Sequence, residues 1–429
     1  MNHRVAITAD PRNSHRHTRA TVTVTDGAGR PLAGQEVRVE QTGHAFLFGN
    51  IGFDFVDLAN DLGTTPPSSP FGGASVEAAR AVAPLWFDLF NQVTLPFYWR
   101  GFEPVRGAPE TERLRRTAEW FAEHGVAVKG HPLLWHTLAP TWLLDLSDEE
   151  VEHEIRHRIT REVSTLGDVV PTWDAINEVV IMPVFDREDN AVTRLAQRLG
   201  RVGMVGLAVD TAREAARDAD RPVSLVLNDF NLSADYERLV EEVLAAGIRI
   251  DAIGLQSHMH QGYRGEEYFA DVLDRFSRFG LPLHLTENTL LSGDPMPAEI
   301  TDLNDYVVDH WPSTPEGEAR QADEIVRHYS QLVAHPAVQA VNYWGLTDEG
   351  AWLGAPCGLV RADHTPKPAY EALKGLIKGA WWLPPTTART DERGRIEIDA
   401  FAGDFRLSTD GRRADLALAA GDQELSIAL

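Results

Sequence analysis

The stretch Trp173-Asp174-Ala175-Ile176-Asn177-Glu178-Val179-Val180 decides the fold. It is an apolar run that carries an Asn-Glu pair as the run ends. Buried parallel strands have this apolar character, and an α/β barrel places its chemistry at the carboxyl ends of such strands. A second short apolar run, residues 283–288, stops on Glu287. Because such strand ends meet on one face of a barrel, we expect Glu178 and Glu287 to share a site.

Strand and helix patterns alternate on both sides of this stretch. Strands are expected at 46–49, 90–96, 126–131, 169–178, 223–228, 250–256, 283–287 and 338–344. Helices are expected from 111 to Gly125, from the Ser147 capping signature to Gly167, and near 202–218, 235–246, 267–278, 317–334 and 367–378. Eight βα units of this length close a parallel barrel. The predicted fold class is α/β, a (β/α)8 TIM barrel over residues 46–380.

The two ends of the chain have β patterns instead. Residues 1–45 are predicted to form a small N-terminal β unit, in which two alternating segments are joined by a hairpin-type turn at residues 26–29. Residues 386–429 are predicted to form a second small β unit. Residues 61–74 are rich in Gly, Thr, Pro and Ser, which predicts a loop.

Composition narrows the class of ligand. The formal net charge is −24, from 40 Lys and Arg against 64 Asp and Glu, so nucleic acids and anionic membranes would be repelled. A neutral sugar fits this charge better. The single cysteine excludes an intramolecular disulfide. No secretory signal is recognisable, which favours a cytoplasmic protein unless a signal was removed, and the pattern does not predict an oligomeric state.

Polar residues collect where the predicted strands end. They are His131, Trp135 and His136; Asn177 and Glu178; Asn228 and Asp229; Gln256, Ser257 and His258; Glu287; and Trp344 with Asp348. Single buried His or Trp residues are usually part of a core. Six such groups at the face of a barrel where catalysis occurs indicate a shared active site. Two carboxyl groups there could serve as proton donor and nucleophile in glycoside hydrolysis.

Other interpretations of these residues were weighed. Glu178 and Glu287 could be structural carboxylates paired with arginine, although ionisable groups at strand ends more often mark function. His258 and His260 alternate along a strand and could bind a metal, but no matching set of Asp or His residues accompanies them. We therefore expect no metal and no cofactor. Asp229 and Asp348 are as well suited to orienting loops as to contacting a substrate.

Six motifs make the chain resemble a known family. They are His131-Pro132-Leu133-Leu134-Trp135-His136, Trp173-Asp174-Ala175-Ile176-Asn177-Glu178, Asn228-Asp229-Phe230-Asn231, Gly254-Leu255-Gln256-Ser257-His258, Leu285-Thr286-Glu287 and Trp344-Gly345-Leu346-Thr347-Asp348. Their order and spacing over roughly residues 46–378 resemble glycoside hydrolase family 10. That family contains mainly endo-β-1,4-xylanases on a (β/α)8 barrel.

The resemblance implies a role for each matching residue. Glu178 would be the acid/base and Glu287 the nucleophile, with retention of the anomeric configuration, which requires carboxyl groups about 5–5.5 Å apart. Asn177 would hold the 2-hydroxyl of the reacting sugar, and His258 would hydrogen-bond the nucleophile. The residues that would line the site around that sugar are His131, Trp135, Gln256, Trp344 and Trp352.

The chain also departs from the family pattern. Xylanases of the family carry a Glu-Asn pair and a Lys after the second strand, which hold the sugar one place beyond the cleavage point. The stretch 93–104 is shorter here and lacks them. Leu138, Phe230 and Thr289 stand where the family has Gln, Tyr and Asp, and the last change removes a partner for His258. The reaction centre is kept while the groove that binds the glycone differs.

Two classes of function therefore follow from the sequence. The first is a retaining β-glycoside hydrolase that cuts xylan-type chains, or acts on another β-linked oligosaccharide or a plant glycoside through the altered groove. The second is a non-catalytic carbohydrate-binding protein on the same scaffold. Binding alone does not require both glutamates, Asn177 and His258, so their presence favours the enzyme.

Overall fold

The computed structural model describes residues 3–8, 10–61 and 74–429. The chain divides into two compact units. One comprises residues 48–324 and 337–369, and the other comprises 1–47, 325–336 and 370–429. Most of the predicted loop at 61–74 lies outside the described residues.

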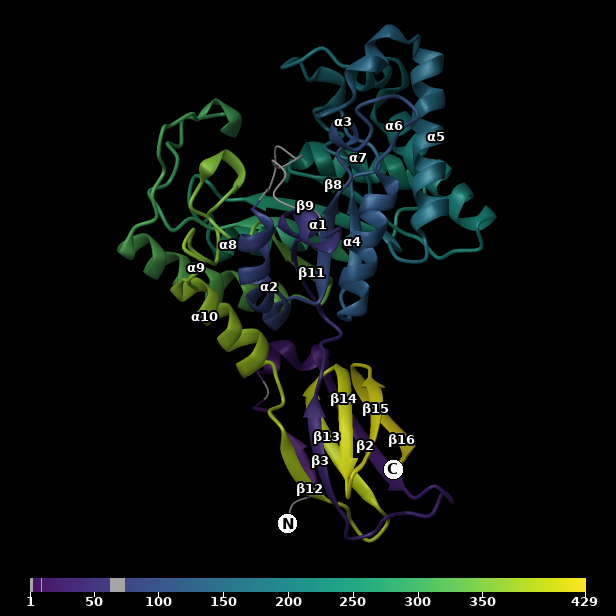
Figure 1. The fold of residues 1–429 in the computed structure, drawn as a ribbon, viewed down its shortest axis with the longest axis vertical. Helices are drawn as coiled ribbons and strands as arrows, with labels where there is room; N and C mark the ends of the chain where they lie inside the picture. Colours follow the sequence, from purple (N-terminus) through teal and green to yellow (C-terminus); the bar gives the residue numbers. More distant parts are fainter. Residues whose placement is uncertain (1–2, 9, 62–73) are drawn as a thin grey trace. The chain divides into compact units, whose positions relative to one another are not determined.

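A closed barrel of eight parallel strands forms the first unit (Figure 1). Its order is β10-β11-β4-β5-β6-β7-β8-β9. The strands are β4 (Leu47–Ile51), β5 (Gln92–Pro96), β6 (Ala127–His131), β7 (Thr172–Asn177), β8 (Ser224–Asp229), β9 (Ala252–His258), β10 (Leu283–Thr289) and β11 (Val338–Tyr343). Each overlaps a strand expected from the sequence, and the predicted TIM barrel is confirmed.

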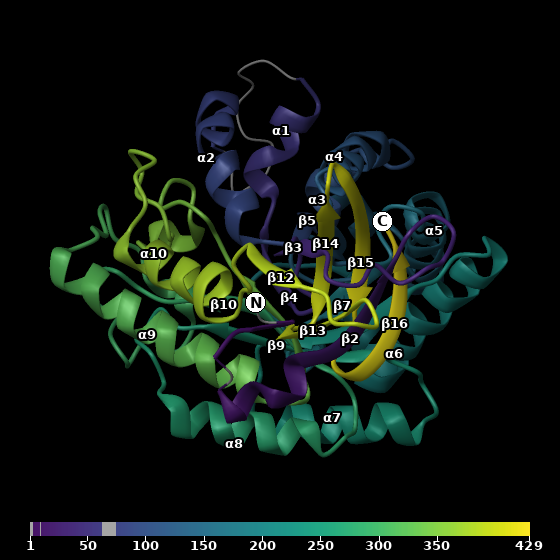
Figure 2. The same cartoon turned by 90° about the horizontal axis from the view of Figure 1, so that it is seen from below.

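Helices lie outside these strands (Figure 2). The helices of the chain are α1 (Val56–Ala59), α2 (Val76–Leu89), α3 (Trp99–Phe102), α4 (Thr111–Glu123), α5 (Asp148–Leu166), α6 (Ala191–Asp218), α7 (Ala234–Ala245), α8 (Glu266–Ser277), α9 (Pro315–Ala334) and α10 (Pro368–Gly375). Within the barrel unit, α4 packs against β5 and β6, α6 against β7, and α8 against β10. The predicted capping box at the start of α5 is present, because Ser147 and Glu150 each bond the other's backbone N–H.

Two helices differ from the sequence expectation. Helix α2 was not predicted, and Pro84 lies inside it, where a proline normally interrupts a helix. Its buried residues nevertheless recur at helical spacing, which packs the helix onto the barrel unit. Helix α6 begins at Ala191 rather than near 202. Gly200, with φ of 72°, makes a kink that joins two helical segments into one element.

A two-sheet β unit contains both ends of the chain. Its strands are β1 (Arg4–Ala6), β2 (His17–Thr25), β3 (Glu36–Gln41), β12 (Thr386–Arg389), β13 (Arg395–Phe401), β14 (Gly403–Thr409), β15 (Arg412–Leu418) and β16 (Gly421–Ala428). One sheet has the order β1-β13-β2-β16, and the other has the order β12-β3-β14-β15. The N-terminal and C-terminal segments therefore pair with each other: β2 and β3 each lie between two C-terminal strands, and β1 is an edge strand beside β13.

The hairpin expected between β2 and β3 is wrong. The turn after β2 exists, with Gly29 donating its N–H to the carbonyl of Asp26. The two strands belong to different sheets, however. Val22 and Val24 of β2 and Val37 of β3 all belong to the buried core of this unit. Two sheets that pack face to face bury alternate side chains between them. Strands β2 and β3 therefore pack against each other across this core and are not hydrogen-bonded neighbours.

No helix in the described ranges combines the length and the apolar character that a membrane crossing requires.

Candidate active site

The turn after β7 presents Glu178 to the barrel mouth. Asn177 is the last residue of the strand, and Glu178 follows with φ of 55°, a left-handed conformation that non-glycine residues rarely adopt. Its N–H donates to the carbonyl of Asn228 at 2.9 Å. The carboxylate of Asp229 accepts the N–H of Val180 at 3.0 Å. The end of β8 therefore holds the turn that carries Glu178, and Asp229 orients a loop.

The carboxyl group of Glu178 touches two side-chain donors. Trp135 donates its indole N–H to one oxygen at 2.9 Å, and Gln256 donates to the other at 3.4 Å. Burial raises the pKa of Glu178 to about 8, with further raising contributions from the negative charges of Glu287 and Asp229. Glu178 is consequently protonated at neutral pH.

Glu287, near the end of β10, lies in a different environment. Its side chain is buried, and one oxygen accepts the amide N–H of Asn228 at 2.9 Å. His258 Nε2 lies 3.0 Å from the other oxygen and donates to it when that nitrogen carries the proton. Each carboxyl oxygen of Glu287 therefore faces one side-chain nitrogen.

Asn228 connects the surroundings of the two glutamates. Its amide nitrogen donates to Asn177 Oδ1 at 2.8 Å as well as to Glu287, which uses both of its N–H groups. Its oxygen accepts the hydroxyl of Thr286 at 2.6 Å. The sequence pattern places Asn228 at a strand end and predicts no role for it. Only its contacts in the folded barrel identify it as a link.

His131 is bonded to Asp174, which forms a buried ion pair with Lys129 that was not predicted. Asp174 lies 2.7 Å from His131 Nδ1 and 2.8 Å from Lys129 Nζ, and all three side chains are buried. Burial opposes ionisation of Asp174, but the Lys129 charge and the His131 bond together lower its pKa. Lys129 and His131 alternate along β6 and so point to the same side, a period-2 signal that was available in the sequence.

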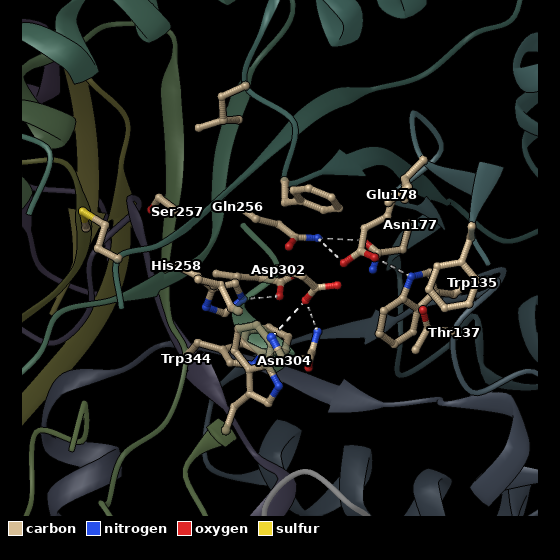
Figure 3. A pocket seen from close by; sticks show the side chains of 18 of the residues that line it. Trp135, Thr137, Asn177, Glu178, Gln256, Ser257, His258, Asp302, Asn304 and Trp344 are labelled. Carbon is tan, nitrogen blue, oxygen red and sulfur yellow. Dashed lines mark hydrogen bonds and ion pairs between the residues drawn. The ribbon is translucent and has the colours of Figure 1, made fainter. Parts of the chain in front are cut away.

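One cavity of about 890 Å³ brings these residues together (Figure 3). It is lined by all nine predicted site residues: His131, Trp135, Asn177, Glu178, Gln256, His258, Glu287, Trp344 and Trp352. Rings crowd one wall, where Trp344 lies 5.3 Å from His131 and Trp352 lies 4.8 Å from His258 between ring centroids. The volume is sufficient for a ligand of several rings.

The residues that depart from the family pattern also take defined places. Tyr98, from the shortened stretch after β5, packs its ring 5.6 Å from those of both His131 and Trp135. Thr289 accepts the N–H of Met259 at 3.0 Å, so it holds the loop after β9. Phe230 lines the cavity with 46% of its surface exposed.

Asp348 and His260 contact other residues than the two glutamates. Asp348 accepts bonds from Lys367 Nζ at 2.7 Å and from the N–H of Gly358 at 2.9 Å, so it orients the loop after β11. His260 is buried beside the rings of Trp311 and Trp352. Across residues 3–8, 10–61 and 74–429, no cluster of three or more His, Cys, Asp or Glu side chains has the arrangement of a metal site.

Arg158 of α5 supports the loops under the pocket. It is fully buried and donates to the carbonyls of Phe97 at 2.5 Å, Pro132 at 3.3 Å and Leu133 at 3.0 Å.

We expect Arg158→Lys to lower the free energy of unfolding by about 2–3 kcal/mol, because a single ammonium group cannot reproduce the planar arrangement of donors on the guanidinium. Urea unfolding measures this change. Arg156→Lys, an exposed change on the same helix, should stay within about 0.5 kcal/mol, and equal losses would contradict the assignment.

Comparisons with known proteins identify one family. The model of glycosyl hydrolase family 10 matches residues 78–376. Endo-1,4-beta-xylanase B of Thermotoga neapolitana is 27% identical over 296 residues, which cover 65% of this chain and 78% of that protein. Endo-1,4-beta-xylanase A of Xylanibacter ruminicola is 30% identical over 295 residues, covering 62% and 76%.

Solved structures show the same fold. Xylanase 10B from Thermotoga petrophila RKU-1, in complex with xylobiose, superposes with a TM-score of 0.62 at 21% identity, covering 78% of this chain and 94% of that one. A family 10 protein from Paenibacillus barcinonensis gives 0.61 at 23% identity, covering 77% and 94%. The family match, which spans well over half of the chain, decides the assignment: this chain belongs to glycosyl hydrolase family 10 and is a glycoside hydrolase.

Proposed function

We propose that the protein is a retaining β-glycoside hydrolase in which Glu178 is the acid/base and Glu287 the nucleophile. The observation that carries this proposal is the placement of two carboxyl groups with different surroundings in one cavity. Glu178 has a pKa raised to about 8 and holds a proton. One oxygen of Glu287 accepts the amide N–H of Asn228, and the other lies 3.0 Å from His258 Nε2. A retaining glycosidase needs one protonated and one ionised carboxyl group.

The proposed reaction has two steps. Glu178 donates its proton to the glycosidic oxygen while Glu287 attacks the anomeric carbon, which releases the leaving group and forms a covalent glycosyl-enzyme. A water molecule, deprotonated by Glu178, then attacks the anomeric carbon and frees Glu287. Each step inverts the anomeric centre, so the product keeps the β configuration.

The neighbouring side chains suit the reacting sugar. Asn177 Oδ1 accepts bonds from Asn228 and Gln256, which turns the Asn177 amide N–H groups toward a sugar 2-hydroxyl. We assign His131, Trp135, Gln256, Trp344 and Trp352 to the walls around that sugar. His258 orients Glu287. The catalytic barrel in this proposal spans residues 46–380.

The substrate includes a β-linked glycone of the xylan type. The support is that relatives across the family match are named as endo-1,4-beta-xylanases. A different β-linked glycone is the second candidate. It is favoured by Tyr98, whose ring occupies the wall beside His131 and Trp135 where the chain lacks the family's Glu-Asn pair.

Incubation with β-1,4-xylotetraose tests this function. We expect release of xylobiose, and proton NMR should show its new reducing end first as the β anomer. First appearance of the α anomer would contradict retention. No cleavage by a folded sample would exclude xylan-type chains, and a panel of other β-glycosides would then identify the glycone. Binding without turnover of any panel member would show a carbohydrate-binding protein instead.

A further inference from the structure

The loop after β7 reaches across the mouth of the barrel. Arg187 in this loop lies 2.5 Å from Asp302 and 2.5 Å from Asp305, both in the loop after β10. Strands β8 and β9 separate β7 from β10 in the barrel, so this contact spans the ends of two strands. Arg100, after β5, lies 2.8 Å from Glu188 and ties the same loop on its other side.

These ion pairs form part of the cavity wall. Arg100, Arg187, Glu188 and Asp302 all line it, and Figure 3 shows Asp302 among the residues around the pocket. Single exposed ion pairs contribute little stability, but several joined in a network hold a loop in one place. We call residues 185–188 with Asp302 and Asp305 the roof segment. Of this segment, Phe185, Arg187, Glu188 and Asp302 line the cavity.

The wall under the roof segment combines apolar side chains with polar ones, which include Gln261, Arg264 and Asn304. The apolar and aromatic residues that line it come from the segments after β7, β8, β9 and β10: Ile181, Phe185, Phe230, Leu232, Met259, Phe269 and Leu303. Phe230 has 46% of its surface exposed, which is unusual for a phenylalanine beside an active site. Among these apolar side chains Phe230 is the most exposed, so it is the one that a ligand in this part of the cavity would contact.

Several polar side chains in the same wall bind protein groups. Gln261 donates its amide to the carbonyls of Pro297 and Ile300. Arg264 donates to the hydroxyl of Tyr268 at 2.6 Å. A second sugar would need hydrogen-bond partners for its hydroxyl groups, and leaving them unpaired in a cavity is unfavourable. Both amide N–H groups of Gln261 are therefore used within the protein, which favours an apolar ligand part over a further sugar beside this residue.

The position of this wall relative to the glutamates identifies what it would contact. Trp344, Trp352 and His131 surround the reacting sugar in the proposed function. The apolar wall follows β7, the strand that delivers Glu178, and continues over β8 and β9. A general acid lies on the side of the leaving group, since it protonates the oxygen that departs.

We propose that the chamber under the roof segment is a subsite for a compact apolar aglycone, so that the preferred substrate is a β-glycoside of a non-sugar alcohol with a ring or hydrocarbon skeleton. This inference rests on the proposed hydrolase function and adds the chemical class of the leaving group. Phe230 contacts the aglycone, and Arg187 keeps the chamber closed through Asp302 and Asp305. The glycosidic bond breaks as in the proposed reaction, and the aglycone leaves as its alcohol.

Two alkyl glycosides with the same glycone test the inference. Methyl and cyclohexylmethyl β-xylobiosides have leaving alcohols of similar acidity, so a difference in kcat/KM reports binding of the hydrocarbon. If the panel identifies another glycone, the same two alcohols are compared on that glycone. We expect kcat/KM to be at least about tenfold higher for the cyclohexylmethyl glycoside, as burial of two methylene groups alone would produce.

Variants connect the preference to the chamber. Phe230→Asn should lower the ratio of the two kcat/KM values several-fold. Arg187→Gln should also lower it, and should raise kcat/KM for xylotetraose relative to the cyclohexylmethyl glycoside. Val105→Asn changes an exposed valine outside the cavity and should leave the ratio unchanged.

The outcomes separate this inference from the proposed function. Turnover of both glycosides at equal rates, or a ratio that Phe230→Asn does not change, would overturn the apolar subsite while the hydrolase assignment stands. A xylosyl leaving group preferred over cyclohexylmethanol would show that Phe230 stacks on a sugar. Failure of folded protein to hydrolyse any glycoside in the panel would overturn both proposals.

Discussion

Glu287→Ala is expected to lower kcat on the order of 10⁵-fold with every substrate, including those with reactive leaving groups. The reason is that no other described carboxyl group has the position of Glu287 between Asn228 and His258. Initial rates with an activated aryl glycoside and with an oligosaccharide measure the loss. Glu299→Ala, an exposed glutamate outside the cavity, should retain full activity.

Azide distinguishes a lost nucleophile from a damaged fold. In Glu287→Ala, azide can occupy the space of the missing carboxylate and attack the anomeric carbon directly, which should produce the α-glycosyl azide. Melting temperatures of the variant and the original protein check the fold. Normal rates in Glu287→Ala would refute the assignment, and so would formation of the β-glycosyl azide in that variant.

Glu178→Ala is expected to have an effect that depends on the leaving group. Substrates whose leaving alcohol needs protonation should lose roughly 10²–10⁴-fold in kcat/KM, whereas a dinitrophenyl glycoside should lose far less. Azide should here yield the β-glycosyl azide, because it attacks the covalent glycosyl-enzyme from the side that Glu178 vacates. Equal losses for all leaving groups would argue against a general acid at this position.

The pH dependence follows from the state of Glu178. Its pKa is raised to about 8, chiefly by burial and next by the charge of Glu287, so the proton needed for catalysis is present below that pH. We expect kcat/KM to fall as pH rises through about 8. The fall should disappear in Glu178→Ala with an activated substrate. In Glu287→Gln the pKa of Glu178 should move down, since a neutral neighbour no longer opposes ionisation, and carbon-13 NMR of the carboxyl group can measure it.

Stability should change with pH in the same range. A carboxyl group with a raised pKa in the folded state binds a proton that the unfolded chain has already released above about pH 4.5. Folding is therefore weakened as pH rises from about 4.5 to about 8. Glu178→Gln removes this dependence, so its melting temperature should exceed that of the original protein more at pH 8 than at pH 5.

Local sequence pattern was sufficient to predict the barrel and to predict that Glu178 and Glu287 lie at the same face of it. Buried parallel strands are apolar along their length, so β7 and β10 are recognisable without knowledge of their neighbours. Their carboxyl ends must meet at one face of a closed barrel, which places Glu178 and Glu287 together before any contact is known. The motifs around them were enough to recognise the family.

Local pattern was misleading where packing overrides propensity. Helix α2 was not predicted, and it contains Pro84, yet the buried face of the helix packs onto the barrel unit in spite of one lost hydrogen bond. The turn after β2 suggested a hairpin, because short turns usually join paired strands. The core between two sheets instead separates β2 from β3.

The fold class, the family and the meeting of Glu178 and Glu287 in one cavity could be predicted from the sequence, because they depend on period, order and spacing along the chain. Only the tertiary structure decided which distant residues touch. The terminal strands pair with each other, Asn228 joins Asn177 to Glu287, and Arg187 reaches Asp302 across the cavity. A lone charged residue in a loop has the same local pattern whether it faces solvent or a partner more than a hundred positions away. Long-range contacts of this kind depend on the order of the strands around the barrel. That order is complete only when the whole domain has folded and the barrel has closed.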